Sequence, residues 1–256
     1  MEEIKKFEKL FESAVKKDSN FLSNIHSLSN LGSNPRGAIA ELALVNFINM
    51  HIAGYKCEHV GVSVGRKKGH TEDIVVYKEN SSIKFEYSVK TYEGNGCQIS
   101  TDKDNYLFPT LESIYNNTNN DVIDDSKFLD NFISSDNNVF NENVMLISFD
   151  TKNNVAEISK FDAEKFINEV KYIKRKKARK HTHWIVYNKD DKVMADIHYG
   201  GKTANAFQRG IWTSNKNYFK SLSGGSVALV DNDMYNIIGK LLCSNVSIQN
   251  KLGDII

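Results

Sequence analysis

Two runs of apolar residues, the second interrupted by alternating polar positions, mark residues 72–92 as a pair of strands. Residues 72–77 and 83–92 are rich in β-branched and aromatic side chains, and the polar residues 79–82 separate them. This pattern predicts a β-hairpin. In its second half the polar residues Glu86, Ser88 and Lys90 alternate with apolar ones. Because successive side chains of a strand point to opposite faces, these three share one face.

The rest of the chain shows further helical and strand patterns. Apolar residues at helical spacing predict an amphipathic helix at residues 38–53, in which Glu41 is a polar position. Residues 116–136 are rich in Asn and Asp and predict a loop or a weakly ordered helix. The other predicted elements are helices at 2–17, 21–31, 107–115 and 162–174, and strands at 55–64, 98–100, 143–150, 155–159, 181–187 and 192–199. We expect the last two strands to pair as a hairpin.

Charge on the polar face of the hairpin gives the first chemical hypothesis. A lysine on the inner face of a central strand is costly to leave unpaired. Asp73 lies on the first predicted strand and would compensate the charge of Lys90 on the second. With a cation beside it, Asp73 would also form a metal site. The alternative is an ordinary surface hairpin in which both side chains are solvated.

This arrangement resembles the PD-(D/E)XK nuclease superfamily, whose hairpin carries Asp on one strand and (D/E)-x-K on the next. The matching residues are Asp73 and Ser88-Val89-Lys90. The helix at 38–53, followed by three predicted strands, is similar to the opening of that fold. Ser88 departs from the pattern, because the family usually has a second acidic ligand at this position.

A carboxylate from elsewhere would have to replace the missing acid. Glu41 is the first candidate, since many members of the superfamily carry a glutamate on the helix before the hairpin. Glu86 is the second, because it lies two residues upstream of Ser88 on the same face. Asp102 and Asp104 are the third, although a solvated turn explains them better.

The resemblance implies Mg²⁺-dependent hydrolysis of DNA. Phosphodiester hydrolysis requires an activated water and stabilisation of developing negative charge, and Mg²⁺ held by carboxylates supplies both. Asp73 and Glu41 would bind the metal, with Glu86 as the alternative ligand. Lys90 would orient or deprotonate the attacking water and offset charge, and Ser88 completes the catalytic set.

Two segments in the C-terminal part predict DNA contacts. Residues 171–180 are strongly basic whereas 121–136 are acidic, and blocks of one sign are typical of interaction surfaces. Residues 200–212 combine glycines with side chains that contact phosphate or read base edges, and they resemble C-terminal segments of some type II restriction endonucleases. The predicted DNA-binding residues are Lys174, Arg175, Lys176, Lys177, Arg179, Lys180, His181, His183, Lys202, Thr203, Asn205, Gln208 and Arg209.

Two of these residues raise a separate question of metal binding. His181 and His183 share a face of one predicted strand and could bind a metal ion. No third ligand lies near them in the sequence, so positions facing DNA or solvent are favoured.

Composition limits the class of protein. The chain has 256 residues, a net charge of +1, 40% hydrophobic residues and 25% charged residues, as expected for a globular protein with a sizeable core. Its three cysteines lack C-x-x-C spacing, so we expect reduced thiols in a cytoplasm and no zinc or disulfide framework. No signal peptide or membrane span is expected.

These observations lead to one prediction of fold and function. We expect an α/β fold whose mixed central sheet is flanked by helices, as in a restriction-endonuclease-like core, with an additional DNA-binding lobe. The core would take residues 1–170 and the lobe 171–256, unless both form one domain. The predicted function is a Mg²⁺-dependent type II restriction endonuclease acting on double-stranded DNA.

Some of this prediction stays open. A DNA methyltransferase would be the genetic partner, and a homodimer is one option for the assembly. The alternatives are a structure-specific repair or recombination nuclease and a DNA-binding protein without catalysis.

Overall fold

The computed structural model describes residues 2–29, 36–60, 72–93, 96–101, 106–133, 143–177, 182–199 and 209–230. The helices are α1 (Glu2–Lys17), α2 (Asn20–Ser29), α3 (Arg36–His51), α4 (Leu107–Thr118), α5 (Ser126–Ile133), α6 (Ala163–Glu169) and the short 3-10 helix η4 (Lys216–Tyr218). The strands are β1 (Tyr55–His59), β2 (Ile74–Lys78), β3 (Lys84–Tyr92), β4 (Cys97–Thr101), β5 (Val122–Ile123), β6 (Asn143–Asp150), β7 (Val155–Phe161), β8 (Val170–Lys177), β9 (Thr182–Asn188), β10 (Val193–Tyr199), β11 (Arg209–Thr213), β12 (Phe219–Ser221) and β13 (Val227–Ala228).

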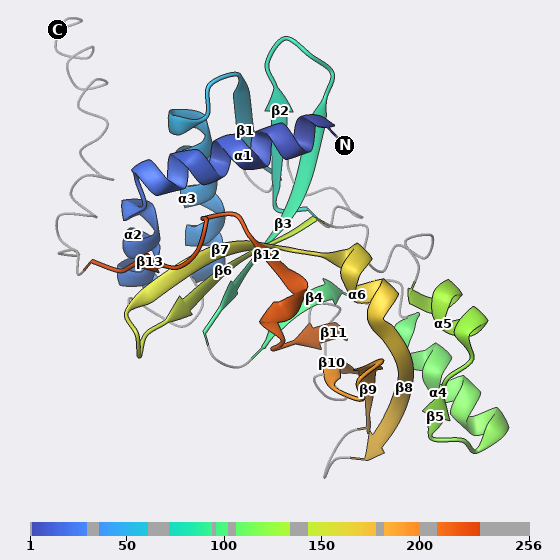
Figure 1. Ribbon diagram of the computed structural model, residues 1–256. Coiled ribbons are helices and arrows are strands. Elements are labelled where there is room, and N and C mark those ends of the chain that lie inside the picture. The colour runs from blue at the N-terminus through green and yellow to red at the C-terminus, as the bar shows by residue number, and fades with distance from the viewer. Residues whose placement is uncertain are drawn as a thin grey trace, which may run out of the picture.

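The strands form two sheets within this part of the chain (Figure 1). The first sheet has the order β1-β2-β3-β6-β7-β12, with β13 also paired to β7, and the second has the order β4-β11-β10-β9-β8-β5. The first sheet is mixed, because β3 and β6 are parallel and its other pairs are antiparallel. The expectation of an α/β fold with a mixed sheet and flanking helices is therefore confirmed.

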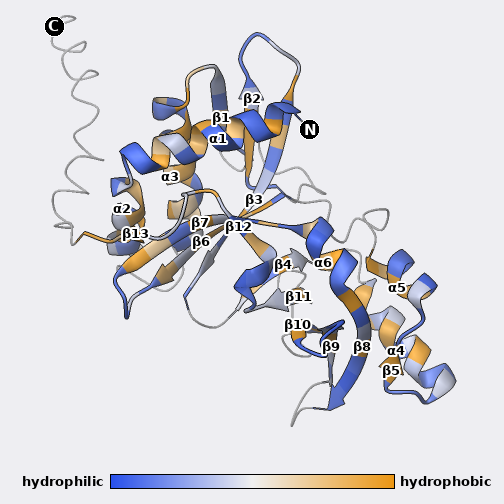
Figure 2. Cartoon of the chain, in the orientation of Figure 1, coloured by the Kyte–Doolittle hydropathy of each residue, from blue (hydrophilic) through white to orange (hydrophobic). Residues whose placement is uncertain are grey.

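Two apolar cores hold the layers together. Helices α1, α2 and α3 cover one face of the first sheet and bury Phe7, Leu44 and Tyr87 there (Figure 1). The second core contains Leu146 of the first sheet and Trp184 of the second, together with residues of α4, α5 and α6. Successive side chains of β3 and β6 point to opposite faces, so each of these strands contributes residues to both cores. In Figure 2, hydrophilic and hydrophobic segments alternate along α1, as expected for a helix with one buried side.

The predicted helix at 162–174 is wrong in its second half. Helix α6 ends at Glu169, and β8 runs from Val170 to Lys177 and pairs with β9. Val170, Tyr172 and Ile173 favour a strand, and β8 pairs with β9 along residues 170–177. The basic residues up to Lys177 therefore lie on a strand, which Figure 2 shows as largely hydrophilic.

Residues 116–136 hold more regular structure than a loop. The end of α4, strand β5 and helix α5 lie in this segment. In α5, Leu129, Phe132 and Ile133 recur at helical spacing and are buried in the second core. The Asp125 carboxylate accepts a hydrogen bond from the Phe128 N–H at 2.8 Å, which caps the first turn. A few apolar residues at the right spacing thus outweigh the polar composition.

The two sheets do not divide the chain at residue 171. The second sheet includes β4 and β5 from before this position, and β12 and β13 return to the first sheet after it. Gly210 fits β11 closely against β4, because a side chain there would meet the Ser100 carbonyl oxygen at 1.9 Å. None of the helices in the described part of the chain combines the length and the apolarity needed to cross a lipid bilayer.

Candidate functional site

Asp73, Ser88 and Lys90 form a hydrogen-bonded group on the first sheet. The Lys90 ammonium donates to Ser88 Oγ at 2.6 Å, and Ser88 Oγ donates to Asp73 Oδ2 at 3.1 Å. Lys90 Nζ lies 3.5 Å from the same carboxylate oxygen. The side chains of Lys90 and Asp73 are 28% and 15% exposed, so solvent or a ligand can reach them.

The geometry arises where β2 begins. Ile74 is the first residue of β2 and pairs with Tyr87, and the Asp73 N–H still donates to the Tyr87 carbonyl at 2.8 Å. The next donor on β3, the Val89 N–H, bonds instead to Asp73 Oδ2 at 2.7 Å. The Asp73 carboxylate thus accepts the hydrogen bond that a backbone carbonyl of the neighbouring strand would otherwise accept. This bond to the backbone holds the carboxylate in a fixed position.

Glu41 lies at the same edge of the sheet. The end of β1, the start of β2 and the end of β3 meet there because neighbouring strands are antiparallel. Arg36, at the start of α3, forms an ion pair with Glu93 just after β3. The Glu41 carboxylate contacts His59 Nε2 at 2.6 Å, and both side chains are nearly buried.

The other candidate acids lie elsewhere or outside the described residues. Glu86 is on the polar face of β3, but it forms an ion pair with Lys84 at 2.5 Å and is 42% exposed. Asp102 and Asp104 fall outside the described residues. The assignment of Glu41 as the acid that replaces the carboxylate missing at position 88 stays a prediction. In its favour, the Glu41 side chain is nearly buried and lies at the same edge of the sheet as Asp73.

The residues at this edge fit a hard divalent cation. The contacts made to Asp73 by Ser88, Val89 and Lys90 all involve Oδ2, so among the described residues Oδ1 remains available to a metal ion. Glu41 offers Oε1 in the same way, since His59 contacts Oε2. One or two carboxylates, completed by waters and phosphate oxygens, are the usual ligands of Mg²⁺.

The basic strand β8 divides into surface and interior positions. Lys174, Lys176 and Lys177 are exposed. Arg175 is 9% exposed and forms two hydrogen bonds with Glu112, at 3.1 Å each. Arg175 was expected to bind DNA, but its guanidinium packs inside the protein because it alternates with its exposed neighbours along the strand.

Many predicted DNA contacts fall outside the described residues. These are Arg179, Lys180, His181, Lys202, Thr203, Asn205 and Gln208. Arg209 begins β11, where its backbone pairs with Tyr199.

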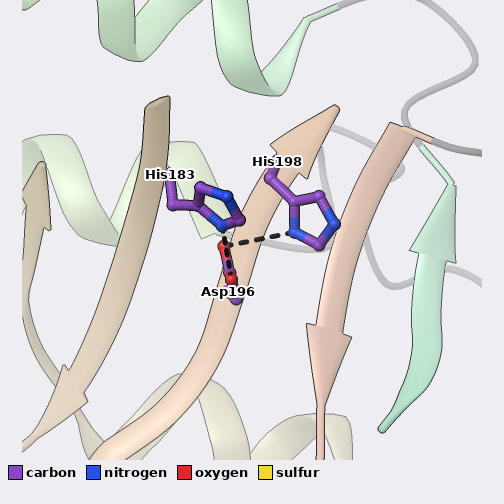
Figure 3. Close-up of side chains that lie close together, drawn as sticks. All are labelled: His183, Asp196 and His198. Carbon is purple, nitrogen blue, oxygen red and sulfur yellow. Dashed lines mark hydrogen bonds and ion pairs between the residues drawn. The ribbon is translucent and has the colours of Figure 1, made fainter. Parts of the chain in front are cut away.

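His183 belongs to a cluster that the sequence reasoning missed. Its Nδ1 lies 2.7 Å from Asp196 Oδ2, and His198 Nδ1 lies 3.2 Å from Asp196 Oδ1 (Figure 3). We expected no third ligand near His183, but β10 supplies two. The signal was Asp196-Ile197-His198, an acid and a histidine two residues apart on the strand predicted to pair with that of His183.

Comparisons with protein-family models, with curated proteins and with solved structures found no match. The function must therefore be inferred from the geometry of the chain itself.

Proposed function

We propose that the chain is a Mg²⁺-dependent nuclease that hydrolyses phosphodiester bonds in double-stranded DNA. The observation that carries this proposal is the Asp73–Ser88–Lys90 group, in which an ammonium and a carboxylate lie 3.5 Å apart beside the start of β2. The order α3, β1, β2, β3 supports it, since this is the opening expected for the PD-(D/E)XK fold.

Each residue of the group has a distinct role in this proposal. Lys90 orients the attacking water and offsets negative charge on the phosphate, and its bond to Ser88 Oγ holds the ammonium in place. The Val89 N–H fixes the Asp73 carboxylate. Asp73 and Glu41 would hold Mg²⁺, which supplies Lewis-acid stabilisation and lowers the pKa of a water.

Exposed lysines on β8 support binding to the DNA backbone. Lys174, Lys176 and Lys177 are free to contact phosphates, which gives affinity without sequence information. The narrower proposal is a type II restriction endonuclease with a DNA methyltransferase as its genetic partner. A structure-specific nuclease and a DNA-binding protein without catalysis are the outcomes that would replace it.

The first experiment measures cleavage of plasmid and phage DNA with Mg²⁺ and with EDTA. Discrete bands would support a restriction enzyme, a smear would indicate a less specific nuclease, and binding without cutting would refute catalysis. Lys90→Ala should reduce cleavage at least ~100-fold while DNA binding, measured by fluorescence anisotropy, survives. Lys84→Ala, a change to an exposed lysine on the same strand, serves as the control and should cut normally.

The second experiment identifies the acids. Asp73→Asn and Glu41→Gln should both abolish cleavage at saturating Mg²⁺, whereas Glu86→Gln should retain it. Loss of activity in Glu86→Gln but not in Glu41→Gln would assign the second ligand to β3. Full activity in Asp73→Asn would exclude this edge of the sheet as the active site.

A further inference from the structure

Three potential metal ligands share one face of the second sheet. In the β9–β10 pair, Asp196 lies opposite Ile185 and Ile197 opposite Trp184, so the same register brings His198 opposite His183. Asp196 and His198 are two residues apart and therefore point to the same side. Trp184 and Ile197 point to the other side and are buried in the second core.

The three side chains converge closely. The ligand atoms of His183, Asp196 and His198 all lie within 4.8 Å of one another, and among the described residues no other set of three His, Cys, Asp or Glu does so. The centroids of the two imidazole rings are 4.8 Å apart, and the Asp196 carboxylate contacts Nδ1 of both rings (Figure 3). The side chains are 24%, 30% and 21% exposed, so an ion can enter the site.

The electrostatics of the cluster favour a cation. Burial raises the pKa of Asp196, but the contacts with His198 and His183 outweigh it and leave that pKa below its usual value. Asp196 is therefore an anion at neutral pH.

The polar atoms of the cluster are incompletely satisfied. His198 Nδ1 and Asp196 Oδ1 are 3.2 Å apart, but the pair lacks hydrogen-bond geometry, and both atoms are buried. Trp212 lies opposite Asp196 on β11 and stacks on His198, with 5.6 Å between ring centroids. Its Nε1–H is also buried without an acceptor among the described residues. Buried polar atoms of this kind are uncommon and call for an unseen ligand or water.

We propose that His183, Asp196 and His198 bind one divalent transition-metal ion of the Zn²⁺ or Co²⁺ type. A metal ion coordinated by His198 and Asp196 would satisfy both buried atoms at once. Two imidazoles select for such ions over Mg²⁺ and Ca²⁺, which prefer oxygen ligands. Three protein ligands leave at least one coordination position open for a water or an anion.

This site is separate from the proposed nuclease centre. Asp73 and Lys90 belong to the first sheet, whereas the three ligands lie on β9 and β10 of the second. The proposal therefore stands whether or not the chain cuts DNA. Asp73→Asn should leave the binding of Co²⁺ to this cluster unchanged.

The test is titration of metal-free full-length protein with Co²⁺, in millimolar Mg²⁺ and without DNA. Stoichiometry comes from equilibrium dialysis, and coordination from the visible absorption of Co²⁺, which Zn²⁺ should then displace. Wild type should bind one Co²⁺ in this way. Because even the loss of a residue that only supports a ligand costs about 10–100-fold in affinity, His198→Gln and Asp196→Asn should each weaken binding by at least ~100-fold.

A matched control separates this site from ordinary histidine binding. His51 also lies near an aspartate, with 3.8 Å between His51 Nε2 and Asp18 Oδ2, but this pair has no third ligand in the part of the chain that the structure describes. His51→Gln should bind Co²⁺ like wild type. Circular dichroism checks that each variant folds, and His183→Gln provides a second variant should His198→Gln unfold. Equal Co²⁺ binding by wild type and the folded ligand variants would overturn the proposal, as would no binding by wild type.

Discussion

Replacing Arg175 should destabilise the fold and leave the DNA-binding surface intact. The basic segment looks uniform in the sequence, but the Arg175 guanidinium bonds to both carboxylate oxygens of Glu112, and the same carboxylate accepts the Trp184 indole N–H at 2.8 Å. The guanidinium also lies over the Tyr115 ring, 3.8 Å from its centroid. Arg175→Ala removes both guanidinium hydrogen bonds and the contact with Tyr115, and it leaves the Trp184 indole N–H as the remaining donor to Glu112.

The size of the effect follows from burial. Breaking a buried ion pair by removing one partner costs about 3–5 kcal/mol. Glu112 remains 24% exposed and can be rehydrated in part, so the lower end, ~3 kcal/mol, applies. At about 2–4 °C per kcal/mol for a chain of this size, the midpoint of thermal unfolding should fall by ~6–12 °C. Arg175→Lys should recover only part of the loss, because an ammonium cannot form the two-pronged contact.

Urea unfolding and DNA-binding titrations together determine whether Arg175 stabilises the fold or binds DNA. Lys174→Ala, the exposed neighbour, should change the unfolding free energy by no more than ~0.5 kcal/mol. Folded Arg175→Ala should bind a duplex as tightly as wild type. An unfolding midpoint equal to that of wild type, combined with weakened DNA binding, would show that Arg175 faces DNA and that the described packing is wrong.

Two further predictions concern other parts of the chain. Lys176→Ala should weaken binding to matched and scrambled duplexes alike and should reduce the slope of log affinity against log salt by about one unit, whereas an unchanged slope would remove β8 from the interface. Cys57 and Cys97 are buried, which raises the pKa of each to about 12. In a Cys243→Ser variant we therefore expect no thiol labelling at pH 8 until urea is added; rapid labelling of the native protein would contradict this burial.

Alternation along strands is the part of the fold that the sequence predicted well. The hairpin of β2 and β3 lies within residues 72–92 as predicted, and polar and apolar side chains alternate along β3. Asp73 lies 3.5 Å from Lys90 across the hairpin. The reason is physical: a side-chain period of two, fixed by burial on one face, leaves little choice of register. The same logic predicted β9 and β10 as a pair.

Tertiary packing determines those parts of the structure that the sequence pattern did not predict. Residues 170–174 follow α6 without a break, and the pairing of β8 with β9 and β5 holds them in a strand. Likewise, local charge gave no sign that Arg175 turns inward, because its partner Glu112 is 63 residues away on α4. A run of basic residues shows how much charge a segment carries. The alternation of side chains along the strand determines which of them reach solvent.

The metal hypothesis shows how a missed pairing changes a conclusion. In the sequence, we considered His183 as a metal ligand only together with His181, two residues away on the predicted strand. Two ligands are too few for a metal site. The strand that pairs with it brings Asp196 and His198 within reach, because directly opposite residues in an antiparallel pair lie closer than residues two apart on one strand. Since the hairpin itself was predicted from the sequence, extending its register by pairing the two strands residue by residue would have found the cluster. A search for metal ligands in β-rich chains should therefore follow the predicted pairing across strands as well as the spacing along one strand.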